Sequence, residues 1–319
     1  MPITINRYAA FAWGTLLLNI FVILWGAFVR ATGSGAGCGS HWPSCNGEVI
    51  PWSAQTETLI EFTHRITSGL ALIAVVILLV WAMRSYPKGH VVRLGAKLSL
   101  AFLILEALLG AGLVLFELVA YNDSVTRAVV GALHLVNTFL LLSVLTLTAW
   151  WASGRQPVQW RGQGWLGWAI WAGFVAILFL GASGAVTALG DTLFPATSLV
   201  EGLREKFSPT AHFLVRLRLY HPILAIVVGA YLIMIANLFN FYRSTLATKQ
   251  LTRVLTGLYI IQLLVGAFNV VLLAPIWMQL IHLFLADLVL IVFVLFMAAA
   301  FAQHVSQGEP IRRAVPQAG

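Results

Sequence analysis

Long apolar stretches, separated by short polar segments, run through the whole sequence. Each stretch is about 20 residues or longer and carries few charges, which is the length that an α-helix needs to cross a bilayer. The pattern predicts eight membrane-spanning helices, near residues 8–30, 58–83, 94–117, 127–152, 165–189, 211–241, 252–273 and 277–302. The predicted fold class is an all-α integral membrane protein.

Composition argues against a soluble fold. Of the 319 residues, 60% are hydrophobic and 9% are charged, and the mean hydropathy is +0.90. A soluble domain carries about 25% charged residues. The first apolar stretch, from Tyr8 to Val29, is long enough to span and has no clear small-residue cleavage site. We therefore expect it to be a membrane helix and not a cleaved signal peptide.

Basic residues gather on one side of the eight-span arrangement. The net charge is +8, but its distribution indicates membrane orientation and not nucleic-acid binding. One side holds Arg7, Arg84, Lys88, Arg93, Lys97, Arg155, Arg161, Arg243, Lys249, Arg253, Arg312 and Arg313, with Glu309 as its single acid. The other side holds Glu48, Glu57, Asp123, Asp191, Glu201 and Glu205. By the positive-inside rule the basic side is cytoplasmic, so we expect a multi-pass protein of the cell membrane with both termini in the cytoplasm.

Both cysteines lie in one glycine-rich segment, GAFVRATGSGAGCGSHWPSCNG (residues 26–47). The predicted orientation puts the loop of residues 31–57 on the outer, oxidising side, where Cys38 and Cys45 are expected to form a disulfide. A ring so short stabilises less than the roughly 3 kcal/mol estimated for a 15-residue loop. Shaping the loop or redox work is therefore a better reason for the pair than overall stability. Zinc is disfavoured, because His41 would be only the third ligand in the loop.

The two halves of the sequence resemble each other weakly. Four pairs of segments align, and the residues that mark them are Gly26 with Gly181 (offset 155), Leu108 with Leu264 (156), His64 with His221 (157) and His134 with His282 (148). A nearly constant offset indicates a duplicated four-helix unit. Because four is an even number of spans, we expect two parallel-repeat four-helix bundles, residues 1–155 and 156–319, related by a pseudo-two-fold axis along the membrane normal.

Four of the eight histidines occupy matched positions: His64, His134, His221 and His282. Each lies within about two turns of the outer end of its predicted helix. A single histidine in a membrane helix usually hydrogen-bonds a neighbouring helix. Four at equivalent points indicate a functional site, because ionisable residues are costly inside a membrane. Facing imidazoles in a four-helix bundle suit axial ligation of haem iron, so we predict two haem sites, one in each half.

The two predicted sites differ in the residue that precedes the first histidine. Glu61 lies three residues before His64 in IEFTHR, and therefore on the same helix face. Arg218 stands at the matching point before His221. An acid beside a metal site can orient a ring, carry protons or stabilise a cation, whereas an arginine suits a haem carboxylate. The first half is therefore expected to do chemistry, and the second half to hold a permanent cofactor.

Other polar residues near the membrane edges have two interpretations. Candidates for contacts with haem propionates, or for interfacial anchoring, are Arg30, Arg65, Arg127, Arg216 and Arg218. Two acids inside spans, Glu106 and Asp287, are expected to hydrogen-bond neighbouring helices. Of the remaining histidines, His90 and His304 are predicted to be solvated in cytoplasmic segments. His41 in the cysteine loop and His212 near the start of the sixth span are predicted to be polar loop or interfacial residues, with a role beside a haem left open.

Taken together, these motifs resemble a known family. VRATGSGAGCGSHWPSC, followed by EFTHR at the start of the second span and by paired histidines in the fourth, sixth and eighth, is similar to haem A synthase, the CtaA/Cox15 family. The resemblance runs from Gly26 to about Asp287. It implies oxidation of the C8 methyl group of haem O to a formyl group, by successive hydroxylations, to give haem A for terminal oxidases.

The resemblance also implies haem ligands and an acid. His64 and His134 would bind the substrate haem O and its product haem A. His221 and His282 would ligate the iron of a resident haem b. Glu61 matches the family's important acid, and so would be the catalytic residue.

For the outer loop and the partners, the resemblance implies less. Cys38 and Cys45 match the family's cysteine pair, with a structural or a redox role. Many relatives carry an acid where His41 stands, so no role is transferred to it. The implied partners are haem O, delivered by haem O synthase, an unidentified electron acceptor and the lipid bilayer, with no nucleic acid. A homo-oligomer is compatible with the sequence.

Two other functions fit part of the pattern. A bis-histidine membrane cytochrome b, acting only in quinone-linked electron transfer, predicts two permanent haems and matching halves. Glu61 and the cysteine loop, however, occur in one half only. A transporter built from repeats would not need four histidines at matched depth.

Overall fold

The computed structural model describes residues 6–51, 55–159 and 161–302. Eight spans in these ranges are long and apolar enough to cross a membrane, which confirms the number predicted from the sequence. Those made of one helix are α1 (Arg7–Ala31), α2 (Thr56–Ser85), α3 (Val91–Leu115), α4 (Val125–Ala152), α5 (Gly164–Leu193), α9 (Leu246–Val271) and α10 (Ile276–Phe301). The sixth span, Phe213–Arg243, consists of α7 (Phe213–Leu217) and α8 (Tyr220–Arg243).

The break between α7 and α8 interrupts a span that the sequence predicts as one helix over 211–241. Pro222 has no N–H to donate to the carbonyl of Arg218, four residues before it. The Arg218 side chain turns toward the C-terminal end of α5, where it donates to two backbone carbonyls. The interruption therefore follows from a proline and from an arginine that is held by another helix.

Two short elements complete the described chain, η1 (Ser34–Ala36) in the cysteine loop and α6 (Leu199–Lys206) between α5 and α7. The Ser198 side chain caps α6, because its Oγ accepts from the backbone N–H of Glu201 at 3.2 Å. The sequence does not predict α6, since eight mixed polar and apolar residues carry no clear helical period.

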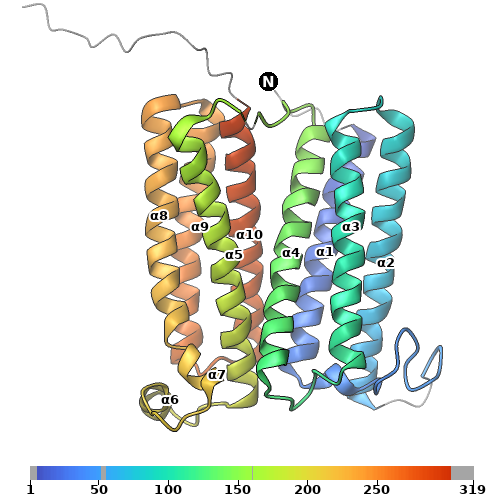
Figure 1. Cartoon of the computed structure of the whole chain (residues 1–319), viewed down its shortest axis with the longest axis vertical. Coiled ribbons are helices and arrows are strands. Elements are labelled where there is room, and N and C mark those ends of the chain that lie inside the picture. Colours follow the sequence, from blue (N-terminus) through green and yellow to red (C-terminus); the bar gives the residue numbers. More distant parts are fainter. Residues whose placement is uncertain (1–5, 52–54, 160, 303–319) are drawn as a thin grey trace, which may run out of the picture.

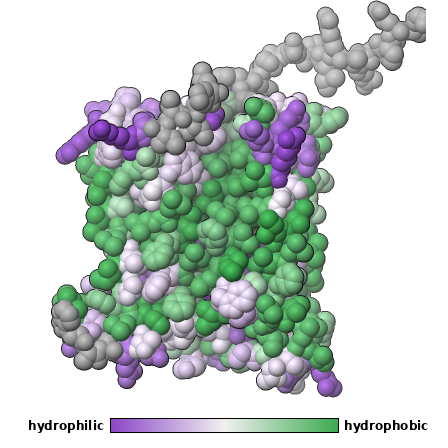
Figure 2. Space-filling view, turned by 180° about the vertical axis from the view of Figure 1, so that it is seen from behind, coloured by the Kyte–Doolittle hydropathy of each residue, from purple (hydrophilic) through white to green (hydrophobic). Residues whose placement is uncertain are grey.

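An apolar band crosses the middle of the face shown in Figure 2, and polar residues gather toward the two ends of that face. Large apolar side chains are exposed along the spans, as Leu17 on α1, Ile226 on α8 and Leu264 on α9 illustrate. Apart from the break in the sixth span, the helical backbone of the spans satisfies its own hydrogen bonds, as a bilayer requires. The molecule is thus a multi-pass membrane protein.

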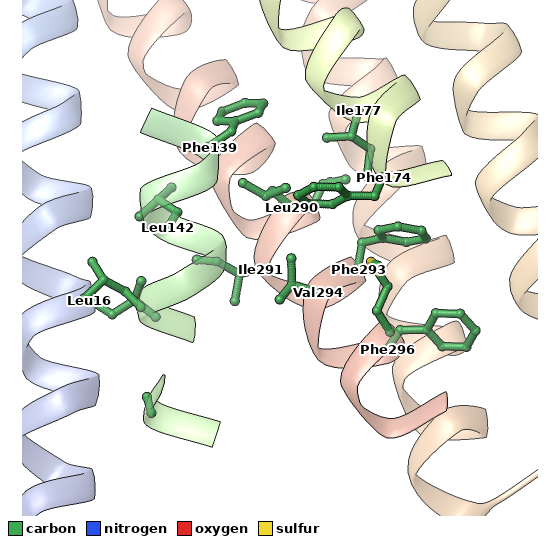
Figure 3. Close-up of a cluster of buried hydrophobic side chains, with 14 of the residues drawn as sticks. Leu16, Phe139, Leu142, Phe174, Ile177, Leu290, Ile291, Phe293, Val294 and Phe296 are labelled. Carbon is green, nitrogen blue, oxygen red and sulfur yellow. The ribbon is translucent and has the colours of Figure 1, made fainter. Parts of the chain in front are cut away.

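The helices form two groups that share one seam. Helices α1–α4 lie on one side, and α5, α8, α9 and α10 on the other (Figure 1). Across the seam, α10 packs against α4 and α1, and α5 packs against α4. Buried side chains of α1, α4, α5 and α10 meet in a hydrophobic cluster that includes Leu16, Phe139, Leu142, Phe174, Ile177, Leu290, Ile291, Phe293, Val294 and Phe296 (Figure 3).

The two ends of the molecule differ in what they carry. The cysteine loop, α6 and α7 lie at one end, and the start of α1 lies at the other, together with the α2–α3, α4–α5 and α8–α9 connections (Figure 1). Most of the basic residues used for the orientation belong to that second end, but Arg312, Arg313 and Glu309 are outside the described residues. The compartment that each end faces, the repeat with its symmetry axis and the boundary near residue 155 stay predictions.

Candidate functional site

A cavity of about 1400 Å³ runs through the interior and is lined by both groups of helices. All four predicted ligands contribute to its wall: His64 on α2 and His134 on α4, hereafter the first pair, and His221 on α8 and His282 on α10, the second pair. The rest of the lining is mainly apolar, with a few polar side chains, as is usual for a site that holds an organic cofactor.

Each of the four imidazoles lies against a glycine of a neighbouring helix. The contacts are Gly26–His64, Gly110–His134, Gly184–His221 and Gly266–His282. A Cβ atom added to the glycine would lie 2.9, 3.7, 3.0 and 3.0 Å, respectively, from the ring Cε1. Glycine is therefore needed in three of the four contacts, because it lets the backbone approach the ring.

These contacts revise one alignment between the two halves of the sequence. The sequence comparison pairs Gly26 with Gly181, but Gly181 lies against Phe139 at the seam. The glycine of α5 that contacts a histidine is Gly184, which lies against His221 of α8. The offset from Gly26 to its structural counterpart is therefore 158 instead of 155. The three-residue difference is close to one helical turn, which explains why two glycine-rich stretches could be aligned in either register.

The second pair has a defined ring geometry. The ring centroids of His221 and His282 are 6.3 Å apart and their planes are at 85°. The Oγ atom of Ser183 lies 2.9 Å from Nδ1 of His221. That hydrogen bond occupies Nδ1, so Nε2 of His221 is the nitrogen available to a metal.

The four histidines fit haem iron as a ligand group. Nδ1 of His64, His134 and His282 is buried without a hydrogen-bond partner among the described residues. Unsatisfied imidazole nitrogens inside an apolar cavity are unusual in a chain that does not bind a metal or cofactor there. Together with the glycine contacts, which leave the rings close to bare backbone, they suit the insertion of a flat macrocycle between paired imidazoles.

Glu61 joins the cavity wall to the cysteine loop. Its side chain is buried, lines the cavity and accepts a 2.8 Å hydrogen bond through Oε2 from the backbone N–H of Cys38. Through Oε1 it pairs with Arg65 at 2.5 Å. Arg65 in turn donates to the backbone carbonyls of His41 at 2.7 Å and Ser44 at 2.5 Å. The acid predicted for chemistry therefore also fastens the loop to α2.

The loop itself is closed and packed tightly on α2. The predicted disulfide between Cys38 and Cys45 is present, and both residues are buried. Gly37 lies so close to the start of α2 that a Cβ would come within 2.5 Å of the Glu57 backbone. Its carbonyl accepts from Thr58 Oγ1 at 2.6 Å. The loop is thus fastened mainly to the start of α2, with further contacts to α1 and to Val119 in the α3–α4 connection.

A family model described as COX15-CtaA, cytochrome oxidase assembly protein, matches residues 9–294. The chain belongs to the COX15-CtaA family. A protoheme IX farnesyltransferase of Thermus thermophilus is 54% identical over 307 residues, which are 95% of this chain and 50% of the relative. A haem A synthase of Geobacillus kaustophilus is 46% identical over 108 residues, 33% of each chain, and one of Halalkalibacterium halodurans is 46% identical over 97 residues, 30% of this chain and 33% of the relative. The chain therefore spans about half the length of the Thermus relative.

In this COX15-CtaA chain, three more of the five candidate arginines have protein partners, besides Arg65. Arg30 donates to Ala188 O at 2.7 Å, Thr192 Oγ1 at 2.5 Å and Gln279 Oε1 at 2.9 Å, so it ties α1 to α5 and α10. Arg127 donates to the carbonyls of Ala120 and Asn122, both at 2.6 Å. Arg218 pairs with Asp191 at 3.1 Å.

The guanidinium groups differ in their access to the cavity. Arg30, Arg65, Arg127 and Arg218 line it, whereas Arg216 is exposed and is not part of the lining. The four that line the cavity are largely committed to carbonyls and acids of the protein. A carboxylate ligand would have to share them or displace these bonds.

The other polar residues singled out in the sequence have mixed outcomes. Glu106 makes the expected bond to a neighbouring helix, since its Oε2 accepts from Asn137 on α4 at 2.6 Å. The same expectation is wrong for Asp287, whose carboxyl oxygens are buried without a hydrogen-bond partner among the described residues. Its nearest positions along one face of α10, such as Leu283 and Leu290, are apolar. His212 stacks on Phe194 outside the cavity lining, with ring centroids 4.7 Å apart.

Among the described polar residues of the cavity that were not singled out in the sequence, one is charged. Lys206, at the end of α6, lines the cavity beside Asp191. Burial lowers the pKa of the Lys206 ammonium group, and the nearby Asp191 carboxylate opposes this shift. The signal that could have found it is a Ser198-x-x-Glu201 capping sequence, which marks the start of α6.

Proposed function

We propose that this chain is a haem A synthase, which oxidises the C8 methyl group of haem O to a formyl group. One observation carries the proposal: an acid and a disulfide-closed loop lie beside only one of the two histidine pairs. Glu61 lines the cavity close to His64 and is bonded to Cys38, whereas Arg218 stands at the corresponding point before His221. Membership of the COX15-CtaA family and the names of the Geobacillus and Halalkalibacterium relatives support the same reaction.

The two histidine pairs would have different occupants. The first pair would bind haem O, which leaves as haem A, and the second pair would ligate a resident haem b. The difference in surroundings supports this division, because the first pair has the acid and the second has Ser183 and Arg218. When bound, haem supplies the redox chemistry that an inert methyl C–H bond requires.

The residues of the chain would orient the substrate and control charge. Glu61 is held from two sides by Cys38 and Arg65, so its carboxylate has a fixed direction and can accept a proton or stabilise positive charge on the methyl carbon. In balance, a methyl group and one water would give a formyl group, four protons and four electrons, and the electrons would pass to an external acceptor.

The proposal also covers the orientation of the protein in the membrane and its origin by duplication. Both termini would be cytoplasmic and the cysteine loop would face the outside, because basic residues gather at the end opposite the loop. The two helix groups would be parallel repeats about an axis along the membrane normal. The matched glycine–histidine contacts, with structural offsets of 158 for Gly26–Gly184 and 156 for Gly110–Gly266, support this origin.

A haem O synthase would supply the substrate. The Thermus relative bears the name of a protoheme IX farnesyltransferase, and this chain matches half of it. A farnesyl transfer to haem yields the substrate class that we propose here. The match supports delivery from such a transferase to the first pair.

A second candidate is a bis-histidine membrane cytochrome b that only transfers electrons. One observation favours it, namely that all four histidines line a single cavity and share the same packing against glycine. This candidate predicts that both haems remain chemically unchanged. It gives no role to Glu61 or to the disulfide.

The test is to co-express the chain with a haem O-producing enzyme in cells that make no haem A, and to identify the extracted haems by chromatography. Haem A in the extract is expected. Only haem B, with haem O unconverted, would reject the synthase and favour the cytochrome.

Two histidine variants provide the matched comparison. His64→Ala is expected to abolish haem A formation. His90→Ala changes a histidine outside the cavity lining and is expected to leave conversion intact. Equal conversion by both variants would remove His64 from the site.

A further inference from the structure

The two histidine pairs differ at a second matched position, on the helices that carry the contacting glycines. Glu106 lies on α3 four residues before Gly110, and Gln262 lies on α9 four residues before Gly266. Both side chains line the cavity. Glu106 is next to His134, and Gln262 is next to His282. The same place therefore holds a carboxylate in one pair and an amide in the other.

The carboxylate of Glu106 is held in a polar cage on α4. Oε2 accepts from Asn137 Nδ2 at 2.6 Å, and Oε1 accepts from the hydroxyl of Thr138. Oε1 also lies 3.5 Å from Nδ1 of His134. His134, Asn137 and Thr138 are at i, i+3 and i+4, so one face of α4 presents the ring and both donors to the same carboxylate.

The corresponding place beside His282 has no such cage. With the offset of 148 that relates the two histidines, the apolar residues Leu285 and Ala286 stand where α4 has Asn137 and Thr138. Gln262 uses its Nε2 to donate to the backbone carbonyl of His282 at 3.1 Å. The same Nε2 lies 3.5 Å from Nε2 of His282. This amide therefore faces the α10 backbone and the Nε2 side of the ring, whereas the Glu106 carboxylate faces Nδ1 of His134.

Three coordinated differences are hard to reconcile with simple helix packing. A bond between α3 and α4 requires only one polar pair, as Gln262 shows for α9 and α10. Two donors that hold both carboxylate oxygens fix the direction of the group. A carboxylate on the outer nitrogen of a metal-binding histidine fixes the tautomer and makes the ring a stronger electron donor.

We propose that Glu106 is a positioning residue for His134: it accepts the Nδ1–H, leaves Nε2 for iron, and gives the first pair a more electron-rich ligand than the second. The proposal rests on the assignment of His134 as a haem ligand under the proposed function. The 3.5 Å contact would shorten to a hydrogen bond once Nε2 is fixed, as contacts in unliganded sites often do. A haem held by the first pair would then be harder to reduce than one in an amide setting.

The test is a redox titration of the full-length protein in detergent, loaded with haem b as the probe and followed by absorbance. The component that disappears in His134→Ala identifies the haem of the first pair. Glu106→Gln keeps the shape and removes the charge, and is expected to raise the midpoint potential of that component by about 59 mV, a tenfold change for a one-electron couple. Glu106→Asp keeps the charge and is expected to shift the potential less.

Gln262→Glu is the matched control in the other pair. It is expected to lower the potential of the second component and leave the first unchanged. The unaffected component in each variant shows that the protein is folded.

The outcomes separate this inference from the proposed function. A His134-dependent component whose potential is the same in Glu106→Gln as in the wild type would overturn the positioning role alone. A protein in which His134→Ala removes no haem component would overturn the ligand assignment, and with it both proposals.

Discussion

The backbone N–H of Cys38 donates a 2.8 Å hydrogen bond to Oε2 of Glu61. This bond connects a disulfide-bonded residue of the outer loop with an acid that lines the cavity next to His64. The position of the carboxylate thus depends on a loop that the disulfide closes. Chemistry at the first pair and the structure of the loop should therefore respond to the same substitutions.

Glu61→Gln should lower haem A formation by about 10²-fold or more, because a positioned acid or base contributes about 10²–10⁴-fold. The amide keeps the size of the side chain but loses the charge that Arg65 pairs with. The measurement is haem A per unit of protein in the co-expression extract. Glu57→Gln, on the same helix in the first turn, is the control. Normal conversion by the Glu61 variant, with normal haem content, would contradict the catalytic role.

Arg65→Leu should make the disulfide easier to reduce. Arg65 donates to the carbonyls of His41 and Ser44, and hydrogen bonds from charged groups are each worth about 1.5–3 kcal/mol. Losing one corresponds to a rise of about tenfold or more in the opening equilibrium of the loop. The rate of reduction by a small thiol measures this opening. Arg84→Leu, on the exposed end of the same helix, should leave the rate unchanged; equal rates in both variants would show that Arg65 does not hold the loop.

Gly266→Ala should weaken haem retention by the second pair, whereas Gly110→Ala should be tolerated by the first. The added Cβ would lie 3.0 Å from Cε1 of His282 in one case and 3.7 Å from Cε1 of His134 in the other. Overpacking of this kind typically costs about 1–3 kcal/mol. The haem content after purification, resolved by redox titration, is the readout. The reverse order of sensitivity would mean that the rings move away from the glycines when a haem is bound.

Arg30→Met should lower the apparent unfolding temperature by several degrees. The substitution removes the bonds from α1 to Ala188, Thr192 and Gln279, and hydrogen bonds that involve a charged group are each worth about 1.5–3 kcal/mol. Thermal unfolding in detergent, followed by intrinsic fluorescence, reports the change. Arg216→Met changes an exposed arginine and should have little effect. If Arg30 only bound a haem propionate and had no structural role, Arg30→Met would leave the unfolding temperature of haem-free protein unchanged.

Asp287→Leu should stabilise the protein or leave it unchanged. A buried carboxyl group without a hydrogen-bond partner among the described residues costs desolvation energy that an apolar side chain avoids. The same unfolding measurement applies, with Asp123→Leu as a control at an exposed acid. A clear loss of stability would show that Asp287 has a partner in the membrane.

Features that depend on local composition could be predicted from the sequence. The eight spans follow from the length of the apolar stretches, and the disulfide between Cys38 and Cys45 from two thiols on one loop. The matched depths of His64, His134, His221 and His282 agree with their place on one cavity wall, although the sequence predicts two sites, one in each half, and not a shared cavity. These signals need no knowledge of which helix faces which.

Features that depend on side-chain direction could not be predicted. The partners of Arg30 lie about 160 and 250 residues further along the chain (158 for Ala188, 249 for Gln279), so no local pattern encodes them. Gly181 and Gly184 differ by almost one helical turn, and only packing decides which contacts a histidine. Pro222 is a local signal for the break at Arg218. The direction of the Arg218 side chain, however, is set by its bonds to carbonyls at the end of α5.

The position of α10 in the seam has a consequence for the order of assembly. This helix packs against α1, α4, α5 and α9 and supplies Gln279 to Arg30, yet it is synthesised after all of them. Chains generally fold from the N-terminus during synthesis. Until α10 is made, the faces of α1 and α4 that it covers are therefore open, and Arg30 lacks its bond to Gln279. Insertion of α10 would then act as the step that locks the two groups together.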